Sequence, residues 1–191
     1  LFAPQDPKAY IYPGKAGYWQ TGFPGGNHDY VVNGGKGGRD MDGRTLFFYL
    51  ATVNTPAMVL ELPGVGSQYA FSSRDSSGAY LDGSKTYKLN IPANPPAKRF
   101  WSFVVYDPQT RSMLQSKEMP YPSKNNKRNP EMAKNADGSI DLYFGPEAPA
   151  GKEANWVKTV PGKGWFGIFR LYGPGQEWFD RSWKLGAIEK I

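Results

Sequence analysis

The sequence contains no cysteine and a single histidine among its 191 residues. Without cysteine, disulfide bonds and thiolate chemistry are both excluded. A three-histidine metal centre is also excluded, and any Ser-His-Asp triad would have to be built on His28. This residue lies in the turn-rich stretch GGNHDY, which is typical of a loop imidazole that makes a local hydrogen bond. The sequence therefore predicts no metal site and no catalytic residue.

Long apolar runs and nucleotide-binding motifs are absent as well. No stretch approaches the roughly 20 apolar residues that a membrane-crossing helix requires, so we expect a chain that is not transmembrane. The sequence has no G-x-S-x-G motif, P-loop or dinucleotide fingerprint, and we predict no cofactor. The formal charge is +6, but the densest basic run, KNNKR at residues 124–128, stands among prolines. We interpret it as a solvated loop and predict no nucleic-acid binding.

Glycine, proline and aromatic residues are abundant, with 23 glycines, 17 prolines and 15% aromatic residues. This composition favours many turns and strands over a helical bundle. Apolar side chains recur with period two in several short stretches separated by turn signals, the clearest of which are residues 85–91, 139–144 and 164–172. Residues 100–106 form a further predicted strand that is largely apolar on both faces, which is typical of a strand in the middle of a structure. Strands at such regular spacing predict a mainly β fold, either an antiparallel β-sandwich or a jelly roll.

The first 65 residues differ from the rest. Residues 1–38 form a Gly/Pro-rich N-terminal arm that is too poor in regular patterns to build its own core. Residues 40–60 carry helical periodicity and predict one or two short helices, with Asp40 or Asp42 as the first cap and Thr55 before a proline as the second. We therefore divide the chain into an N-terminal arm with a short helical linker region at 1–65 and a β-sandwich domain at 66–191.

A candidate ligand-binding site lies where the long aromatic strand 100–106 runs into polar residues, close to the end of the last long strand. The candidate residues are Tyr106, Asp107, Gln109, Arg111, Arg170 and Tyr172. They could line the mouth of the sandwich and bind a small-molecule or carbohydrate ligand. Alternatively, an aspartate and an arginine could form a buried ion pair that fixes the corner.

A carboxylate-dependent enzyme that acts on a saccharide or another small polar substrate is the alternative to a binding role. Such an enzyme needs two carboxyl groups about 5–10 Å apart. The candidates are Asp107, Asp141, Glu147, Glu153, Glu177 and Asp180, whereas Asp75, Asp82 and Asp137 are better explained as turn formers. Sequence spacing alone gives no distance between any two of them.

Several segments resemble a known family. LDGSKTYKLNIP, PAKRFWSFVVYDPQTRSML and EWFDRSWKLGAIE are similar to the C-terminal domain of domain-of-unknown-function family 1214, which is commonly paired with family 1254. The resemblance implies a jelly-roll sandwich over about 66–191, a preceding β domain missing from this chain, and export to the periplasm or extracellular space. It assigns no catalytic residue.

Taken together, these observations predict a non-catalytic binding or assembly β-sandwich module. The arm cannot bury its own apolar residues, which favours a homo-oligomer in which it wraps a neighbouring chain.

Overall fold

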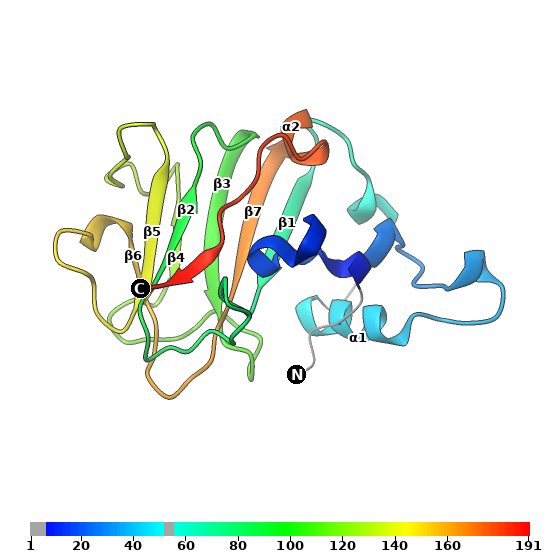
Figure 1. Ribbon diagram of the computed structural model, residues 1–191, viewed down its shortest axis with the longest axis horizontal. Helices are drawn as coiled ribbons and strands as arrows, with labels where there is room; N and C mark the ends of the chain where they lie inside the picture. Colours follow the sequence, from blue (N-terminus) through cyan, green and yellow to red (C-terminus); the bar gives the residue numbers. More distant parts are fainter. Residues whose placement is uncertain (1–6, 52–55) are drawn as a thin grey trace.

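The computed structural model describes residues 7–51 and 56–191, and its main feature is a pair of four-stranded sheets (Figure 1). The first sheet has the order β1-β7-β3-β4 and the second the order β6-β5-β2-β8. The strands are β1 (Ser67–Ser72), β2 (Tyr87–Ile91), β3 (Ala97–Tyr106), β4 (Ser123–Asn125), β5 (Ile140–Gly145), β6 (Trp156–Lys158), β7 (Phe166–Pro174) and β8 (Ile188–Lys190). The prediction of a mainly β chain is confirmed.

One strand pair departs from the antiparallel prediction. All pairs in the first sheet are antiparallel, but β6 runs parallel to β5, so the second sheet is mixed. A parallel neighbour requires a connection that returns the chain to the same end of the sheet. Residues 146–155, which include the short turn η6 (Glu153–Asn155), provide that return.

The two sheets share one hydrophobic core. Side chains of β2 alternate between buried and half-buried positions, as the period-two pattern predicts. The rings of Phe103 on β3 and Phe144 on β5 meet with their centroids 4.9 Å apart. Leu89, Leu142 and Phe169 are fully buried around them. This contact joins the inner faces of the sheets.

Strand β4 is the one strand among the described residues that the sequence patterns missed. It lies inside the polar stretch 113–136, and its three residues carry no apolar alternation. Its middle residue, Lys124, is only 8% exposed. The interpretation of KNNKR as a solvated loop is therefore wrong at this position, although Lys127 and Arg128 are exposed.

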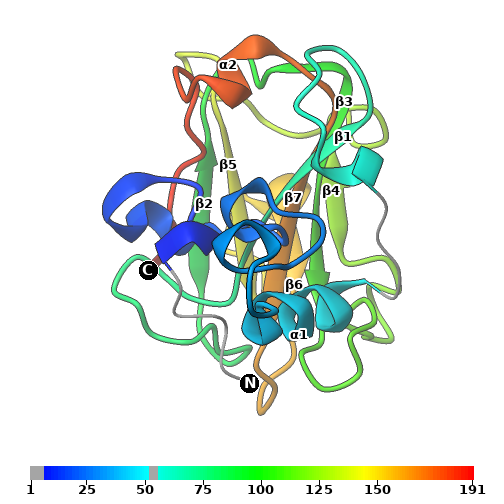
Figure 2. The ribbon, with the colours of Figure 1, turned by 90° about the vertical axis from the view of Figure 1, so that its right-hand side faces the viewer.

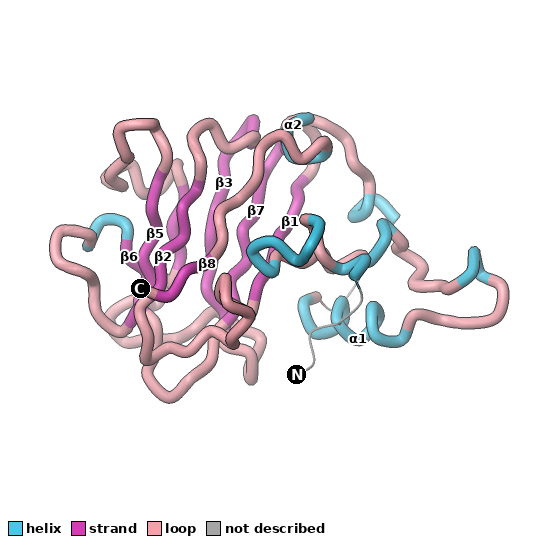
Figure 3. The backbone as a smooth tube through the Cα atoms, in the orientation of Figure 1, coloured by secondary structure: helices cyan, strands magenta, loops and turns pink. Residues whose placement is uncertain are grey.

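Helical structure is limited to short elements, as Figure 3 shows. Helix α1 (Met41–Leu50) begins after Asp40, whose side chain accepts a hydrogen bond from the Gly43 amide at 2.8 Å, so the predicted cap is confirmed. The second predicted cap, Thr55, lies outside the described residues. The remaining elements are α2 (Gln176–Phe179) and the short 3-10 turns η1 (Pro7–Ala9), η2 (Pro13–Tyr18), η3 (Pro24–Gly26), η4 (Asn33–Gly35) and η5 (Pro56–Val59). Neither α-helix of the described part has the length and hydropathy needed to cross a membrane.

The N-terminal segment, defined as residues 7–20, packs against both sheets (Figures 1 and 2). The backbone of Gln20 pairs with Phe71 on β1, the edge strand of the first sheet. The indole of Trp19 is fully buried and donates to the Gly186 carbonyl, two residues before edge strand β8. The domain boundary near residue 65 stays a prediction.

Candidate functional site

Asp107 closes the corner that follows β3. Its Oδ1 accepts hydrogen bonds from the amides of Gln109 and Thr110 at 2.8 and 3.3 Å, and its Oδ2 accepts from Lys163 Nζ at 2.6 Å. Burial favours a higher pKa for Asp107, but these hydrogen bonds outweigh it and hold the pKa below its ordinary value. The corner thus contains an ion pair, as one interpretation of the sequence expected, but its cation is Lys163 and not an arginine.

Gln109 and Arg111 lie on the exposed loop beyond this corner. The Arg111 amide donates to the Asp107 carbonyl at 2.8 Å. The guanidinium of Arg111 lies over two rings of α1, 5.9 Å from the centre of the Phe48 ring and 6.0 Å from the centre of the Tyr49 ring. The turn after β3 therefore positions Gln109, and this turn together with helix α1 positions Arg111.

The other candidate residues come together on the outer face of the first sheet. Arg170 of β7 stands opposite Tyr69 of β1, and its Nη2 donates to the hydroxyl of Tyr106 from β3. The rings of Tyr172 and Phe100 stack beside it, with centroids 4.2 Å apart. We call Tyr69, Phe100, Tyr106, Arg170 and Tyr172 the arginine–aromatic face. The predicted proximity of Tyr106 and Arg170 is confirmed, whereas the antiparallel pairing places Tyr172 opposite Phe100, at the other end of β3 from Tyr106. Whether these residues bind a ligand stays a prediction.

The electrostatics of this face are set by burial and by one cation. Burial raises the pKa of Tyr106, and the neighbouring Arg170 guanidinium opposes this shift only in part. Tyr106 is therefore a neutral phenol at neutral pH that accepts a hydrogen bond from the arginine. Arg170 Nε is buried and has no hydrogen-bond partner in residues 7–51 and 56–191.

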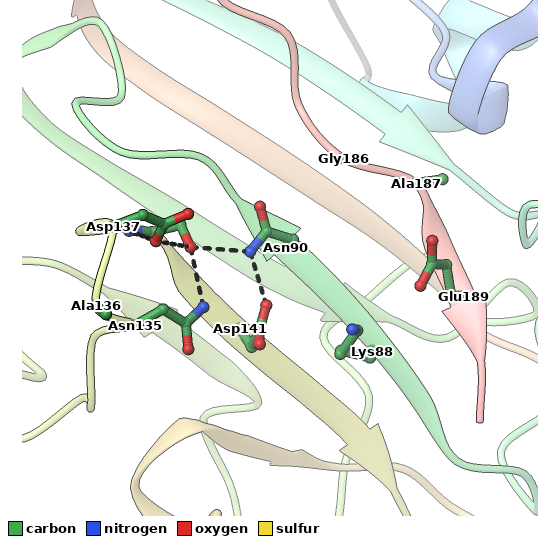
Figure 4. Close-up of a pocket in the computed structure, with 10 residues that line it drawn as sticks. Lys88, Asn90, Asn135, Ala136, Asp137, Asp141, Gly186, Ala187 and Glu189 are labelled. Carbon is green, nitrogen blue, oxygen red and sulfur yellow. Dashed lines mark hydrogen bonds between the residues drawn. The ribbon is translucent and has the colours of Figure 1, made fainter.

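A second candidate site is a polar pocket on the outer side of the second sheet (Figure 4). Its volume is about 520 Å³. Strands β2, β5 and β8, the turn before β5 and the segment before β8 build it. The lining residues are Lys88, Asn90, Asn135, Ala136, Asp137, Ser139, Asp141, Gly186, Ala187 and Glu189.

Hydrogen bonds hold one group of the pocket side chains in place, namely Asn90, Asn135, Asp137, Ser139 and Asp141. Asn90 Nδ2 donates to Asp141 Oδ1 at 2.7 Å and to Ser139 Oγ at 3.1 Å. Asp137 accepts from the hydroxyl and amide of Ser139, which lowers the pKa of Asp137 and confirms it as a turn former. Lys88 and Glu189 are register partners on β2 and β8. The pocket thus combines one ammonium, two carboxamides and three carboxylates.

Of the pocket residues, sequence reasoning named Asp141 as a candidate carboxylate and missed the set as a whole. No local signal joins Lys88 and Asn90 to Glu189, because β8 pairs with β2 across about a hundred residues of chain. The described residues contain no group of three or more His, Cys, Asp or Glu side chains arranged to hold a metal ion. His28 Nε2 lies 3.3 Å from the carboxylate of the adjacent Asp29, a local contact of the kind expected.

Comparisons with known proteins place the chain in a family but give it no activity. No curated protein matches it. The VPA0106 protein from Vibrio parahaemolyticus has a similar structure, with a TM-score of 0.59 and 22% identity over 86% of this chain and 39% of that one. An uncharacterised protein from Burkholderia cenocepacia gives a TM-score of 0.43 and 19% identity over 72% of this chain and 30% of that one. The chain therefore spans well under half the length of either protein, and the Vibrio likeness supports the fold alone. A family model described as a protein of unknown function, DUF1214, matches residues 66–176, more than half of the chain, and the chain therefore belongs to this family.

Proposed function

We propose that the chain is a non-catalytic binding module that holds a small polar ligand, such as a saccharide, in the pocket over β2, β5 and β8. The observation that carries this proposal is the set of preordered polar side chains around one cavity, with Asn90 fixed to both Asp141 and Ser139. Side chains that are already in place lose little conformational entropy when a ligand binds.

The chemistry of the lining suits a ligand with many hydroxyl groups. Lys88 and Asn135 offer donors, and Asp141 and Glu189 offer acceptors. The pocket's volume of about 520 Å³ lies within the range of about 300–1,000 Å³ that small-molecule sites occupy. A hydroxyl can donate to one side of such a site and accept from the other.

We propose a jelly-roll β-sandwich for the scaffold. Two four-stranded sheets that share one core support this architecture, because a jelly roll has eight strands in two sheets. From the family resemblance we also propose that the protein is exported to the periplasm or extracellular space and follows a further β domain. From the composition of the N-terminal arm we propose that it assembles into a homo-oligomer. Light scattering after size exclusion tests the oligomer, and a compact monomer would count against it.

Binding in the pocket is tested by thermal-shift screening of mono- and disaccharides, followed by titration calorimetry of any hit. We expect at least one saccharide to bind, and Asp141→Asn to weaken it at least tenfold, because an acceptor in the pocket becomes a donor. Glu147→Gln is the matched control, since Glu147 is exposed and lies outside the pocket. Failure of the whole panel, or equal affinity in the Asp141 variant, would overturn the proposal.

A carboxylate-dependent enzyme that acts on a saccharide is the second candidate function. Three carboxylates line the same pocket and favour it, namely Asp137, Asp141 and Glu189. A pair of carboxylates on either side of a glycosidic bond is the requirement of saccharide hydrolysis. Turnover of nitrophenyl glycosides by the full chain, abolished in both Asp141→Asn and Glu189→Gln, would replace the binding proposal with this one. Binding without turnover supports the binding module.

A further inference from the structure

We propose that the arginine–aromatic face is a second ligand site, separate from the pocket, which takes an organic anion. The anion's carboxylate or phosphate pairs with the Arg170 guanidinium, and its ring packs on Tyr69. This site lies on the first sheet and does not depend on the proposed function of the pocket on the second.

The guanidinium of Arg170 is held in one orientation. Its Nη2 donates to Tyr106 Oη, and its central carbon lies 5.6 Å from the centre of the Tyr69 ring and 5.7 Å from that of Tyr106. Rings that flank a guanidinium stabilise its charge and restrict its motion. A cation held in this way can pair with an anion without first losing side-chain entropy.

This guanidinium has unused hydrogen-bonding capacity. Arg170 Nε is buried and makes no hydrogen bond with any residue that the structure describes, although buried donors in folded proteins are paired in the great majority of cases. Among the described residues, no carboxylate lies within the 4.0 Å that defines an ion pair with Arg170. A half-buried cation without a counter-charge is costly, and an anion bound to the accessible part of the guanidinium would supply that charge.

Two further cations over aromatic rings extend the same pattern along this side of the molecule. Lys127 Nζ lies 5.9 Å from the centre of Phe100, which stacks on Tyr172. Arg111 lies over Phe48 of α1. Neither cation has an acidic partner within 4.0 Å in the described part of the chain. The positive charge favours anions, and the formal charge of +6 acts in the same direction.

The preference for an anion that carries a ring follows from the exposed aromatic side chains. Tyr69 is 42% exposed, so a second ring can lie against it at little cost. A guanidinium matches the geometry of carboxylate and phosphate groups through two parallel N–H···O bonds. The ligand class is therefore a ring-bearing carboxylate or phosphate.

The test titrates the full chain with benzoate, phenyl phosphate and the neutral benzamide, observed through the Nε–Hε NMR signal of Arg170. We expect at least one anion to shift this signal at saturation and to bind at least tenfold more tightly than benzamide. The stronger of benzoate and phenyl phosphate identifies the anionic group. If benzamide binds as well as both anions, or if the Nε–Hε signal does not move, the proposal is wrong.

Variants separate this site from general charge attraction. Arg170→Lys keeps the charge but loses the planar guanidinium, and we expect it to bind the anion at least tenfold more weakly. Arg39→Gln removes an exposed arginine outside the arginine–aromatic face and should leave the affinity unchanged. Tyr69→Ala changes an exposed position and should weaken binding severalfold even if Arg170 variants fold poorly. Equal losses in the Arg39 and Arg170 variants would show that net charge alone attracts the anion. Asp141→Asn should have no effect here, so failure of this site and failure of the pocket are distinguishable.

Discussion

Asp107 shows how one carboxylate can determine the shape of a corner. Its two oxygens have separate tasks, because Oδ1 accepts from two loop amides while Oδ2 pairs with Lys163. The hydrogen bonds from the two amides fix the turn directly after β3, and the ion pair connects this turn to the loop before β7. Since Asp107 is buried and Lys163 is 45% exposed, the ion pair is partly screened by solvent.

The first prediction separates these two tasks. Asp107→Asn keeps an oxygen for the amides and loses the ion pair, so we expect a loss of about 1 kcal/mol in the free energy of unfolding. Asp107→Ala also leaves two amides without their acceptor and should cost about 2 kcal/mol more. Urea denaturation of both variants at neutral pH measures the two steps. If Asp107→Asn and Asp107→Ala lose the same free energy of unfolding, the hydrogen bonds from the two amides contribute nothing to stability.

The pH dependence of the same pair has a definite sign. Because the folded pKa of Asp107 is lowered, the ionised form stabilises the native state above the unfolded pKa. That unfolded value is about 3.9. The stability difference between wild type and Asp107→Asn should therefore be constant from pH 7 to about pH 5 and shrink as the pH falls through 4 toward the lowered pKa. A difference that stays unchanged down to pH 2 would contradict the assignment.

At the residue scale, the sequence predicts partners within strands better than partners between loops. Tyr106 and Arg170 were expected to be close if their two long strands were neighbours, and their side chains are hydrogen-bonded across the antiparallel pair of β3 and β7. Lys163 was not expected as the partner of Asp107. Which side chain of a loop reaches a carboxylate depends on the loop's path in space, and no periodic pattern records that path.

At the scale of elements, β7 lies in the interior of the first sheet and approaches its neighbour β3 closely. β7 pairs with β1 on one side and β3 on the other. The ring of Phe103 on β3 lies over Gly167 of β7, so closely that a Cβ at Gly167 would stand 2.2 Å from Phe103 Cζ. Glycine at this position therefore provides the space that the Phe103 ring occupies in the core.

The third prediction concerns this contact. Gly167→Ala should destabilise the protein by about 1–3 kcal/mol, because the Phe103 ring must leave its position in a close-packed core. Gly164→Ala is the matched control, since its added Cβ meets nothing closer than 3.5 Å. Combining Gly167→Ala with Phe103→Leu should recover part of the loss. Denaturation midpoints of wild type, Gly167→Ala, Phe103→Leu and the double variant measure the coupling, and strictly additive effects would contradict the proposed clash.

The sequence predicts elements where apolar alternation is long and fails where it is short. β2, β3, β5 and β7 were expected close to their observed bounds, because each carries at least three alternating apolar side chains. β4 has the residues Ser-Lys-Asn and pairs with β3 through its backbone, which leaves no hydrophobic signature. The polar pocket was missed for a related reason, since it depends on the pairing of β2 with β5 and β8.

At the scale of the whole molecule, the N-terminal segment links the two sheets. Gln20 exchanges backbone hydrogen bonds with Phe71 on the edge of the first sheet. Trp19 is fully buried, contacts Phe103 in the core and donates to Gly186 beside the second sheet. The Leu185 amide donates to the hydroxyl of Tyr12. These contacts imply that the segment unfolds together with the strands.

The last prediction tests this coupling. Trp19→Ala should lower the free energy of unfolding by about 3–5 kcal/mol, as expected for a fully buried tryptophan. Tyr121→Ala, at an aromatic residue that is 73% exposed, should change it by less than about 0.5 kcal/mol. Native-state hydrogen exchange adds a direct measure, because the Gln20 amide bonds to the Phe71 carbonyl at 2.8 Å and should exchange as slowly as the central amides of β7. If the segment were only a loosely attached arm, Gln20 would exchange much faster than β7, and Trp19→Ala would leave the main unfolding transition in place.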